Sequence, residues 1–156
     1  MKIIVVSDNH GLAKPIKDIY DKYIDETSLF FHCGDIELPL QALNGYMYVK
    51  GNNDYGNIKD EIIYKLDDDN KIYMTHGHHY LYEGNLNKLY SKAKEHGCNI
   101  VLFGHTHRFT YKVINGVHLI NPGSLRYNRD FTDPSYAIIN IDNNIISVKK
   151  ITYGID

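Results

Sequence analysis

Residues 99–107 read NIVLFGHTH, an apolar run that ends in a glycine and two histidines. A short apolar run of this kind predicts a buried β-strand, with the histidines at its carboxyl end. His105 and His107 are two positions apart, so in an extended chain both imidazoles would face the same side. Neutral imidazole is the commonest metal-binding side chain. The stretch therefore indicates a metal site at a strand end, and a solvated polar loop is the alternative.

The first third of the chain repeats this arrangement. Three apolar runs are predicted strands, at residues 1–6, 29–33 and 46–49. Two segments between them, at residues 12–23 and 36–43, are predicted helices. Strands that alternate with helices favour right-handed parallel crossovers, and ligands of such sheets bind at the carboxyl ends of the strands. Each of these strands ends in polar residues, which are therefore expected to meet.

From residue 61 onward the pattern changes to hairpins. Predicted strands at 61–66 and 71–75 are joined by an acidic run, which indicates a solvated turn rather than a calcium site. Asn85 is suited to cap a helix that runs to about His96. Asn115-Gly116 is typical of a type I′ hairpin turn, and a last hairpin is expected over 136–151. An α/β (α+β) fold with two sheets face to face and helices outside would satisfy both halves.

Length and composition restrict the class of protein to which this chain can belong. The 156 residues, 43% hydrophobic and 23% charged, suit a single domain over 1–156 with one substantial core. The net charge of −2 gives no general case for nucleic-acid or membrane binding, so an anionic substrate needs a local positive site. Cys33 and Cys98 are predicted to be reduced, buried thiols. The N-terminal apolar run is too short for a signal peptide or membrane span, which predicts a cytoplasmic protein.

Seven polar residues follow predicted strands in five separate segments. They are Asp8, His10, Asp35, Asn52, His76, His105 and His107. Each residue alone has an ordinary alternative, such as a helix cap or a turn. Together they form a set of oxygen and imidazole donors that is sufficient for two metal ions, provided that one carboxylate bridges.

These blocks resemble, in order along essentially the whole chain, the signature of the calcineurin-like metallophosphoesterases. The blocks are DNH at 8–10, GD at 34–35, GN at 51–52, HG at 76–77 and GHTH at 104–107. The small size and the closing NPGS at 121–124 resemble the compact YfcE-like phosphodiesterase branch. The resemblance implies a four-layer αββα sandwich of two mixed sheets flanked by helices. It also implies a hydrolase in which hydroxide between two divalent ions attacks a small phosphate-ester substrate.

The resemblance assigns ligands position by position. One ion would take Asp8, His10, Asp35 and His107. The other would take Asp35, Asn52, His76 and His105, with Asp35 as the bridge. This histidine-rich donor set favours Mn, Ni, Fe or Zn over Mg or Ca. Two divalent ions, two carboxylates and one hydroxide leave about one positive charge to hold a phosphate. The oligomeric state stays open, and a homo-oligomer is allowed.

The chain departs from the pattern at Asn53, where many relatives carry a histidine that protonates the leaving group. A positioned general acid contributes about 10²–10⁴-fold, and an amide cannot act as one. We therefore expect a preference for good leaving groups, or a proton from another residue. Asp54 is a candidate for that proton donor or else has a structural role. His78 is a candidate for contact with the substrate phosphate, for support of the ligands, or for plain exposure.

Two further classes of function remain beside the phosphodiesterase. One is a phosphomonoesterase or nucleotide pyrophosphatase of the same superfamily, which the absence of an acid at Asn53 disfavours for simple monoesters. The other is a non-catalytic scaffold for protein contacts, as in the retromer subunit that shares this fold. The retention of all seven ligand positions argues against the scaffold.

Overall fold

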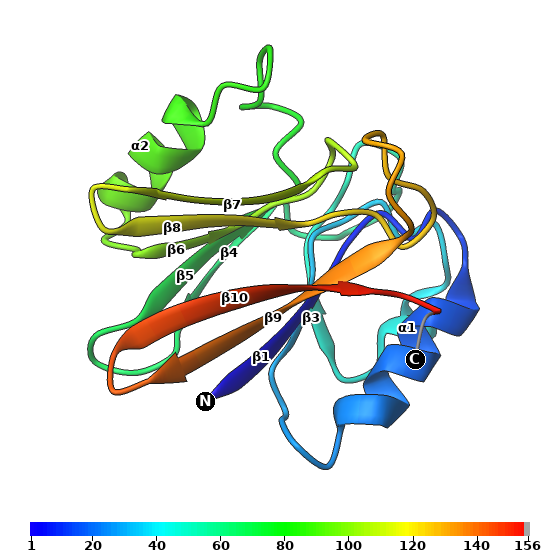
Figure 1. Ribbon diagram of the computed structural model, residues 1–156. Coiled ribbons are helices and arrows are strands. Elements are labelled where there is room, and N and C mark those ends of the chain that lie inside the picture. The colour runs from blue at the N-terminus through cyan, green and yellow to red at the C-terminus, as the bar shows by residue number, and fades with distance from the viewer. Residues whose placement is uncertain (155–156) are drawn as a thin grey trace.

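The computed structural model describes residues 1–154 and shows two five-stranded mixed sheets stacked face to face (Figure 1). The first sheet has the order β10-β9-β1-β2-β3, and its strands are β1 (Lys2–Val6), β2 (Phe30–His32), β3 (Tyr46–Tyr48), β9 (Ser135–Asp142) and β10 (Ile145–Thr152). The second has the order β4-β5-β6-β8-β7, and its strands are β4 (Glu61–Lys65), β5 (Lys71–Thr75), β6 (Ile100–Leu102), β7 (Phe109–Ile114) and β8 (Val117–Pro122). The helices are α1 (Ala13–Tyr23) and α2 (Asn87–Glu95), with a short 3₁₀ helix η1 (Leu40–Leu43).

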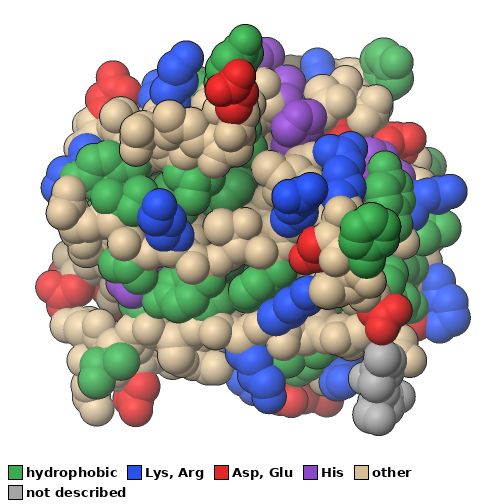
Figure 2. Space-filling view, turned by 45° about the horizontal axis from the view of Figure 1, so that its top comes forward, with side chains coloured by type: hydrophobic (Ala, Val, Ile, Leu, Met, Phe, Trp, Pro, Cys, Tyr) green, Lys and Arg blue, Asp and Glu red, His purple; other side chains and the backbone are tan. Residues whose placement is uncertain are grey.

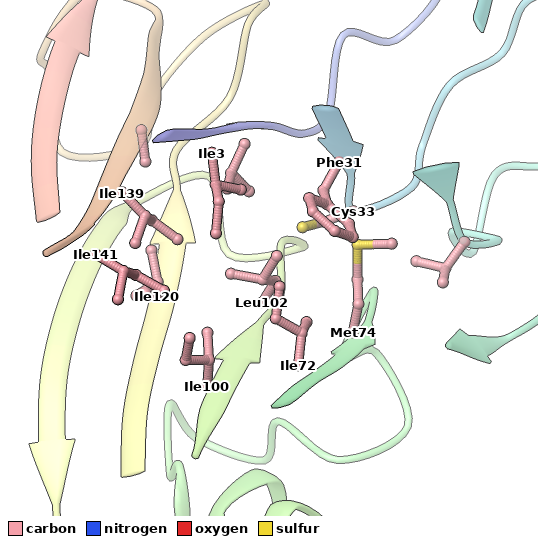
Figure 3. Packing of buried hydrophobic residues seen from close by; sticks show 13 residues of the cluster. Ile3, Phe31, Cys33, Ile72, Met74, Ile100, Leu102, Ile120, Ile139 and Ile141 are labelled. Carbon is pink, nitrogen blue, oxygen red and sulfur yellow. The ribbon is translucent and has the colours of Figure 1, made fainter. Parts of the chain in front are cut away.

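Strand β1 shows why the layers stack in this way. Its apolar run is buried on both faces, as is usual for parallel strands with covered sheets. Ile3 and Val5 point into the core between the two sheets, whereas Ile4 and Val6 pack under α1. Figure 3 shows Ile3 opposite apolar side chains of the second sheet.

Helix α2 covers the outer face of the second sheet. Leu89 and Ala93 of the helix pack against Tyr73, Val101 and Leu119 of that sheet. The order of layers is therefore helix, sheet, sheet, helix, and the predicted αββα architecture is confirmed.

Most predicted elements are present, but the helix expected over 36–43 is wrong in its first half. Within this range, only the 3₁₀ helix η1 forms, in the second half. The backbone N–H groups of Ile36 and Glu37 are bonded to the Asp54 carboxylate, and Pro39 has no N–H to give. Glu37 has a left-handed φ of 51° and Pro39 has an extended ψ of 137°, and neither value is compatible with an α-helix, so no helix forms over 36–39.

Other details follow the predictions. Asn115 and Gly116 both have positive φ, 45° and 79°, as a type I′ turn requires. Cys33 and Cys98 are both buried and free, and they lie in different core clusters. Across residues 1–154, none of the helices has the length and apolar character needed to cross a membrane.

Candidate metal centre

The loops that follow β1, β2, β3, β5 and β6 meet at the carboxyl ends of the parallel strands. Asp8 N donates to Gly34 O at 3.0 Å, and Gly104 N donates to His76 O at 3.0 Å. The loops pack so closely that a Cβ on Gly104 would collide with Ser7 Oγ. The glycines in these blocks therefore allow the polar residues beside them to approach one another. Figure 2 shows histidine side chains reaching the surface at this end of the molecule, beside Lys and Arg side chains.

Asp8, His10 and His107 form a first cluster. The two Nε2 atoms of His10 and His107 are 3.0 Å apart. Oδ1 of Asp8 lies 3.2 Å from Nε2 of His107 and 3.6 Å from Nε2 of His10. Three potential ligand atoms thus converge on one small space.

The hydrogen bonds behind these rings show that the cluster fits a cation. Nδ1 of His10 lies 2.6 Å from a Glu37 carboxylate oxygen, and Nδ1 of His107 lies 3.1 Å from the Tyr127 carbonyl oxygen. Oxygen acceptors call for N–H at Nδ1, so in the neutral rings both Nε2 atoms carry lone pairs. Those lone pairs face each other, and the buried Oδ1 of Asp8 has no hydrogen-bond partner. A divalent metal between the three atoms would satisfy all of them.

A second cluster contains Asp35, Asn52, His76 and His105. Nδ1 of His76 donates to the Cys33 carbonyl at 2.7 Å, which leaves a lone pair on its Nε2. That Nε2 lies 3.0 Å from Oδ1 of Asn52 and 3.4 Å from Oδ2 of Asp35, both of which are acceptors. Nδ1 of His105 lies 3.1 Å from the same Asn52 oxygen. The second cluster therefore brings the lone pair of His76 against the oxygen acceptors of Asn52 and Asp35.

Asp35 lies between the two clusters. Its Oδ2 is 3.7 Å from Nε2 of His10 and 3.4 Å from Nε2 of His76. This is the position that a bridging carboxylate would need. Asp8 is also close to the second cluster, because its Oδ1 is 3.9 Å from Nε2 of His76. Asp8, Asp35 and His76 accordingly form a second group able to hold a metal, although the sequence assigned Asp8 to the first ion only.

The electrostatics of the centre favour positive charge. Burial raises the pKa of Asp8, but attraction from His10 and His107 and the hydrogen bond from Ser7 outweigh it, so that pKa is well below its usual range. Asp35 is likewise buried, yet His76 lowers its pKa to about 2. The Asp8 carboxylate raises the pKa of His10 to about 9. Both carboxylates are thus ionised at neutral pH, and they attract a proton or a metal ion to the rings.

Five of the seven candidate ligands have left-handed backbone conformations. The φ values are 54° for Asp8, 42° for His10, 58° for Asp35, 71° for His105 and 54° for His107. Such conformations are uncommon outside glycine, cost on the order of 1–3 kcal/mol each, and gather at functional sites. The expectation that His105 and His107 lie in extended chain is therefore wrong. The turn between them sends one ring to each cluster.

Asn53 supports the carboxylate between the clusters. Its backbone N–H donates to Oδ1 of Asp35 at 2.9 Å, and its side-chain Nδ2 donates to Oδ2 of Asp35 at 3.0 Å. The side chain is exposed and has no proton to transfer at useful pH. These contacts indicate that Asn53 orients Asp35.

Asp54 holds two loops together by its carboxylate. Oδ2 accepts the N–H groups of Asp35 and Gly51, each at 2.8 Å. Oδ1 accepts those of Ile36 at 2.8 Å and Glu37 at 2.9 Å. Both carboxylate oxygens are thus occupied by backbone donors, and neither is turned toward a leaving group. This favours the structural role over the proton donor.

His78 lies behind the second cluster. Its ring centroid is 5.4 Å from that of His76 and 6.2 Å from that of His105. Burial and the neighbouring histidines lower its pKa to about 4, and its buried Nδ1 has no hydrogen-bond partner. His78 is therefore a neutral ring that packs beside candidate ligands.

Glu37 is the residue of this site that the sequence did not indicate. It follows the GD block by two positions and has a positive φ of 51°, but a lone glutamate in a loop carries no signal. The Nδ1 atoms of His76 and His107 have backbone carbonyls as partners, those of Cys33 and Tyr127. Every residue has a backbone carbonyl, so the sequence does not show which carbonyls accept hydrogen bonds from the histidine rings.

The fold and the cluster of carboxylates and imidazoles define a metallophosphoesterase. The chain belongs to the calcineurin-like phosphoesterase superfamily, whose domain model matches residues 1–144. It is 38% identical over 152 residues to the probable metallophosphoesterase YsnB of Bacillus subtilis, covering 96% of this chain and 89% of that protein. It is 30% identical over 144 residues to the phosphodiesterase MJ0936 of Methanocaldococcus jannaschii, covering 79% and 83%.

A solved structure from Streptococcus pneumoniae, described as a conserved uncharacterized protein and predicted phosphoesterase, shares the whole architecture. The TM-score is 0.90 at 32% identity, over 97% of this chain and 88% of that one. The predicted family is confirmed by these matches.

Proposed function

We propose that this chain is a phosphodiesterase that works with two divalent transition-metal ions, Mn, Ni, Fe or Zn. The observation that carries the proposal is the first cluster, where lone pairs of His10 and His107 face each other beside the unpartnered Oδ1 of Asp8. Without a metal, these atoms need an added proton between them, in keeping with the raised pKa of His10, and a divalent ion would satisfy all three at once. The likeness to a relative named as a phosphodiesterase supports the choice of reaction.

Two ligand sets would hold the ions. The first is Asp8, His10, Asp35 and His107, and the second is Asp35, Asn52, His76 and His105. When bound, divalent ions supply a lowered pKa for water and a positive clamp for phosphate oxygens. The chain itself orients the donors: Glu37 fixes the ring of His10, and Asn53 fixes the carboxylate of Asp35. A small phosphate ester is the substrate class that this site fits.

The position of Asn53 bears on which esters are cleaved. Its side chain donates to Asp35 and offers no exchangeable acid. Because an amide cannot protonate the leaving oxygen, we expect a preference for acidic leaving groups. Rates for a series of aryl methyl phosphates should fall steeply as the leaving-group pKa rises. A rate that does not depend on that pKa would show that another residue supplies the proton.

The central experiment combines metal analysis with turnover. The purified protein should bind about two divalent ions, and it should hydrolyse bis(4-nitrophenyl) phosphate faster than 4-nitrophenyl phosphate. Asp35→Asn should lose both ions and the activity. Asp68→Asn, at a 97% exposed side chain in a hairpin turn, is the matched control and should change neither.

The same experiment separates the alternatives. Tight metal without turnover under any of the four ions would favour the protein-interaction scaffold. Faster turnover of the monoester than of the diester would favour a phosphomonoesterase.

A further inference from the structure

A surface cavity of about 510 Å³ lies beside the candidate metal centre. It is bounded by residues 36–40, after β2, and by residues 53–58, after β3. Its lining is largely apolar, and the apolar members are Ile36, Leu38, Pro39, Leu40, Tyr55 and Ile58. This volume is within the range of pockets that hold small organic groups, about 300–1,000 Å³.

The cavity adjoins the candidate metal centre, because two of its lining residues contact candidate metal ligands. Glu37 lines it and contacts Nδ1 of His10 at 2.6 Å. Asn53 lines it and contacts Oδ2 of Asp35 at 3.0 Å. A phosphate ester seated on the metals would therefore have one substituent at the mouth of this cavity.

The two walls of the cavity are fixed relative to each other. Asp54, which also lines the cavity, bonds the backbone of Ile36 and Glu37 on one wall and Gly51 at the base of the other. The apolar rim is nevertheless open to solvent, with Tyr55 92% and Leu40 39% exposed. A fixed shape with an exposed apolar rim is typical of a binding groove.

The charges of the lining select the kind of group that would enter. Glu37 and Asp54 are acidic, and no lysine or arginine from the described part of the chain lines the cavity. A negatively charged substituent would be repelled there. An uncharged, flat ring could instead stack on Tyr55 and contact Leu40.

We propose that this cavity is a subsite for an aromatic ring carried by the ester oxygen that is not cleaved, whether an aryl group or a nucleobase. The proposal rests on the proposed phosphodiesterase function and adds to it the class of substrate. It makes Tyr55 and Leu40 determinants of specificity that contact the substrate and leave the metal ligands untouched.

Binding of phosphonates to the Mn²⁺-loaded protein tests the subsite without turnover. Calorimetry should show that phenylphosphonate binds about tenfold or more tightly than methylphosphonate, because apolar contacts in a pocket discriminate to at least this degree. Tyr55→Ala and Leu40→Ala should each reduce that ratio several-fold while Mn²⁺ binding stays the same. Ile145→Ala is the matched control: this side chain is 71% exposed at the start of β10, and its loss should leave the ratio unchanged. Equal affinity of the two phosphonates, or a ratio that neither variant changes, would overturn the proposal.

Kinetics separate this proposal from the proposed function. Bis(4-nitrophenyl) phosphate and methyl 4-nitrophenyl phosphate share one leaving group and differ in the other substituent. Tyr55→Ala should lower kcat/KM for the first and spare the second. Retained phenyl preference with no turnover of either diester would refute the phosphodiesterase and keep the subsite. Turnover of both diesters without phenyl preference would refute the subsite and keep the phosphodiesterase.

Discussion

Replacement of Asp54 by asparagine distinguishes the two roles that the sequence allows for this residue. The carboxylate accepts four backbone N–H groups at 2.8–2.9 Å, and it is only 7% exposed. Asparagine keeps the shape but offers one acceptor oxygen in place of two. Two of the four N–H groups would then face an NH₂ group and lose their acceptor.

The expected loss of stability follows from that count. An unsatisfied buried donor costs about 1–3 kcal/mol, so Asp54→Asn should lower the free energy of unfolding by about 2–6 kcal/mol. This is a large part of the roughly 5–15 kcal/mol that stabilises an ordinary domain. The two loops also carry Asp35 and Asn52, so metal affinity should fall together with stability.

Urea denaturation of the metal-free protein measures the first effect, and calorimetric titration with Mn²⁺ measures the second. Asp68→Asn is the matched control, because the Asp68 side chain is 97% exposed and its carboxylate contacts the exposed Lys65 in the same hairpin. That variant should stay within about 0.5 kcal/mol of the wild type. Unchanged stability and metal affinity in Asp54→Asn, with lost activity toward poor leaving groups alone, would refute the structural role and restore the proton donor.

Three further predictions concern the candidate centre. Glu37→Ala should weaken Mn²⁺ binding about 10–100-fold by freeing the ring of His10, and Glu37→Gln should retain more of the affinity; equal affinity in all three proteins would contradict this. Asn53→Ala removes one hydrogen bond to Asp35 and should reduce kcat/KM less than about tenfold, so a larger loss would give Asn53 a direct part in the chemistry. Gly51→Ala places a Cβ against the backbone and carboxylate of Asp35, and metal analysis should show marked loss of bound ions, whereas Gly154→Ala, with open space around it, should retain them.

Much of the fold was predictable because its signals are local. The apolar run of β1 reads as a strand buried on both faces, and Asn115-Gly116 reads as a tight hairpin turn. The helix expected over 36–43 failed because Glu37 has a left-handed backbone, in a loop whose N–H groups at Ile36 and Glu37 bond the carboxylate of Asp54, which is distant in sequence. A local pattern cannot show that a distant carboxylate will take those donors.

In the candidate site, too, local sequence signals were predictable and contacts between distant residues were not. The sequence alone determined the family and a set of seven donors, because metal ligation demands particular side chains, and these stand in order after strands. Only the tertiary structure decided which of these metal-ligand side chains lie together in each cluster. The turn at His105 and His107 separates two rings that an extended chain would have aligned, and Glu37 joins the site only because the loops after β1 and β2 lie side by side. The physical reason is that residue type records what an atom can bind, whereas the direction of its lone pair depends on backbone contacts that any residue can make.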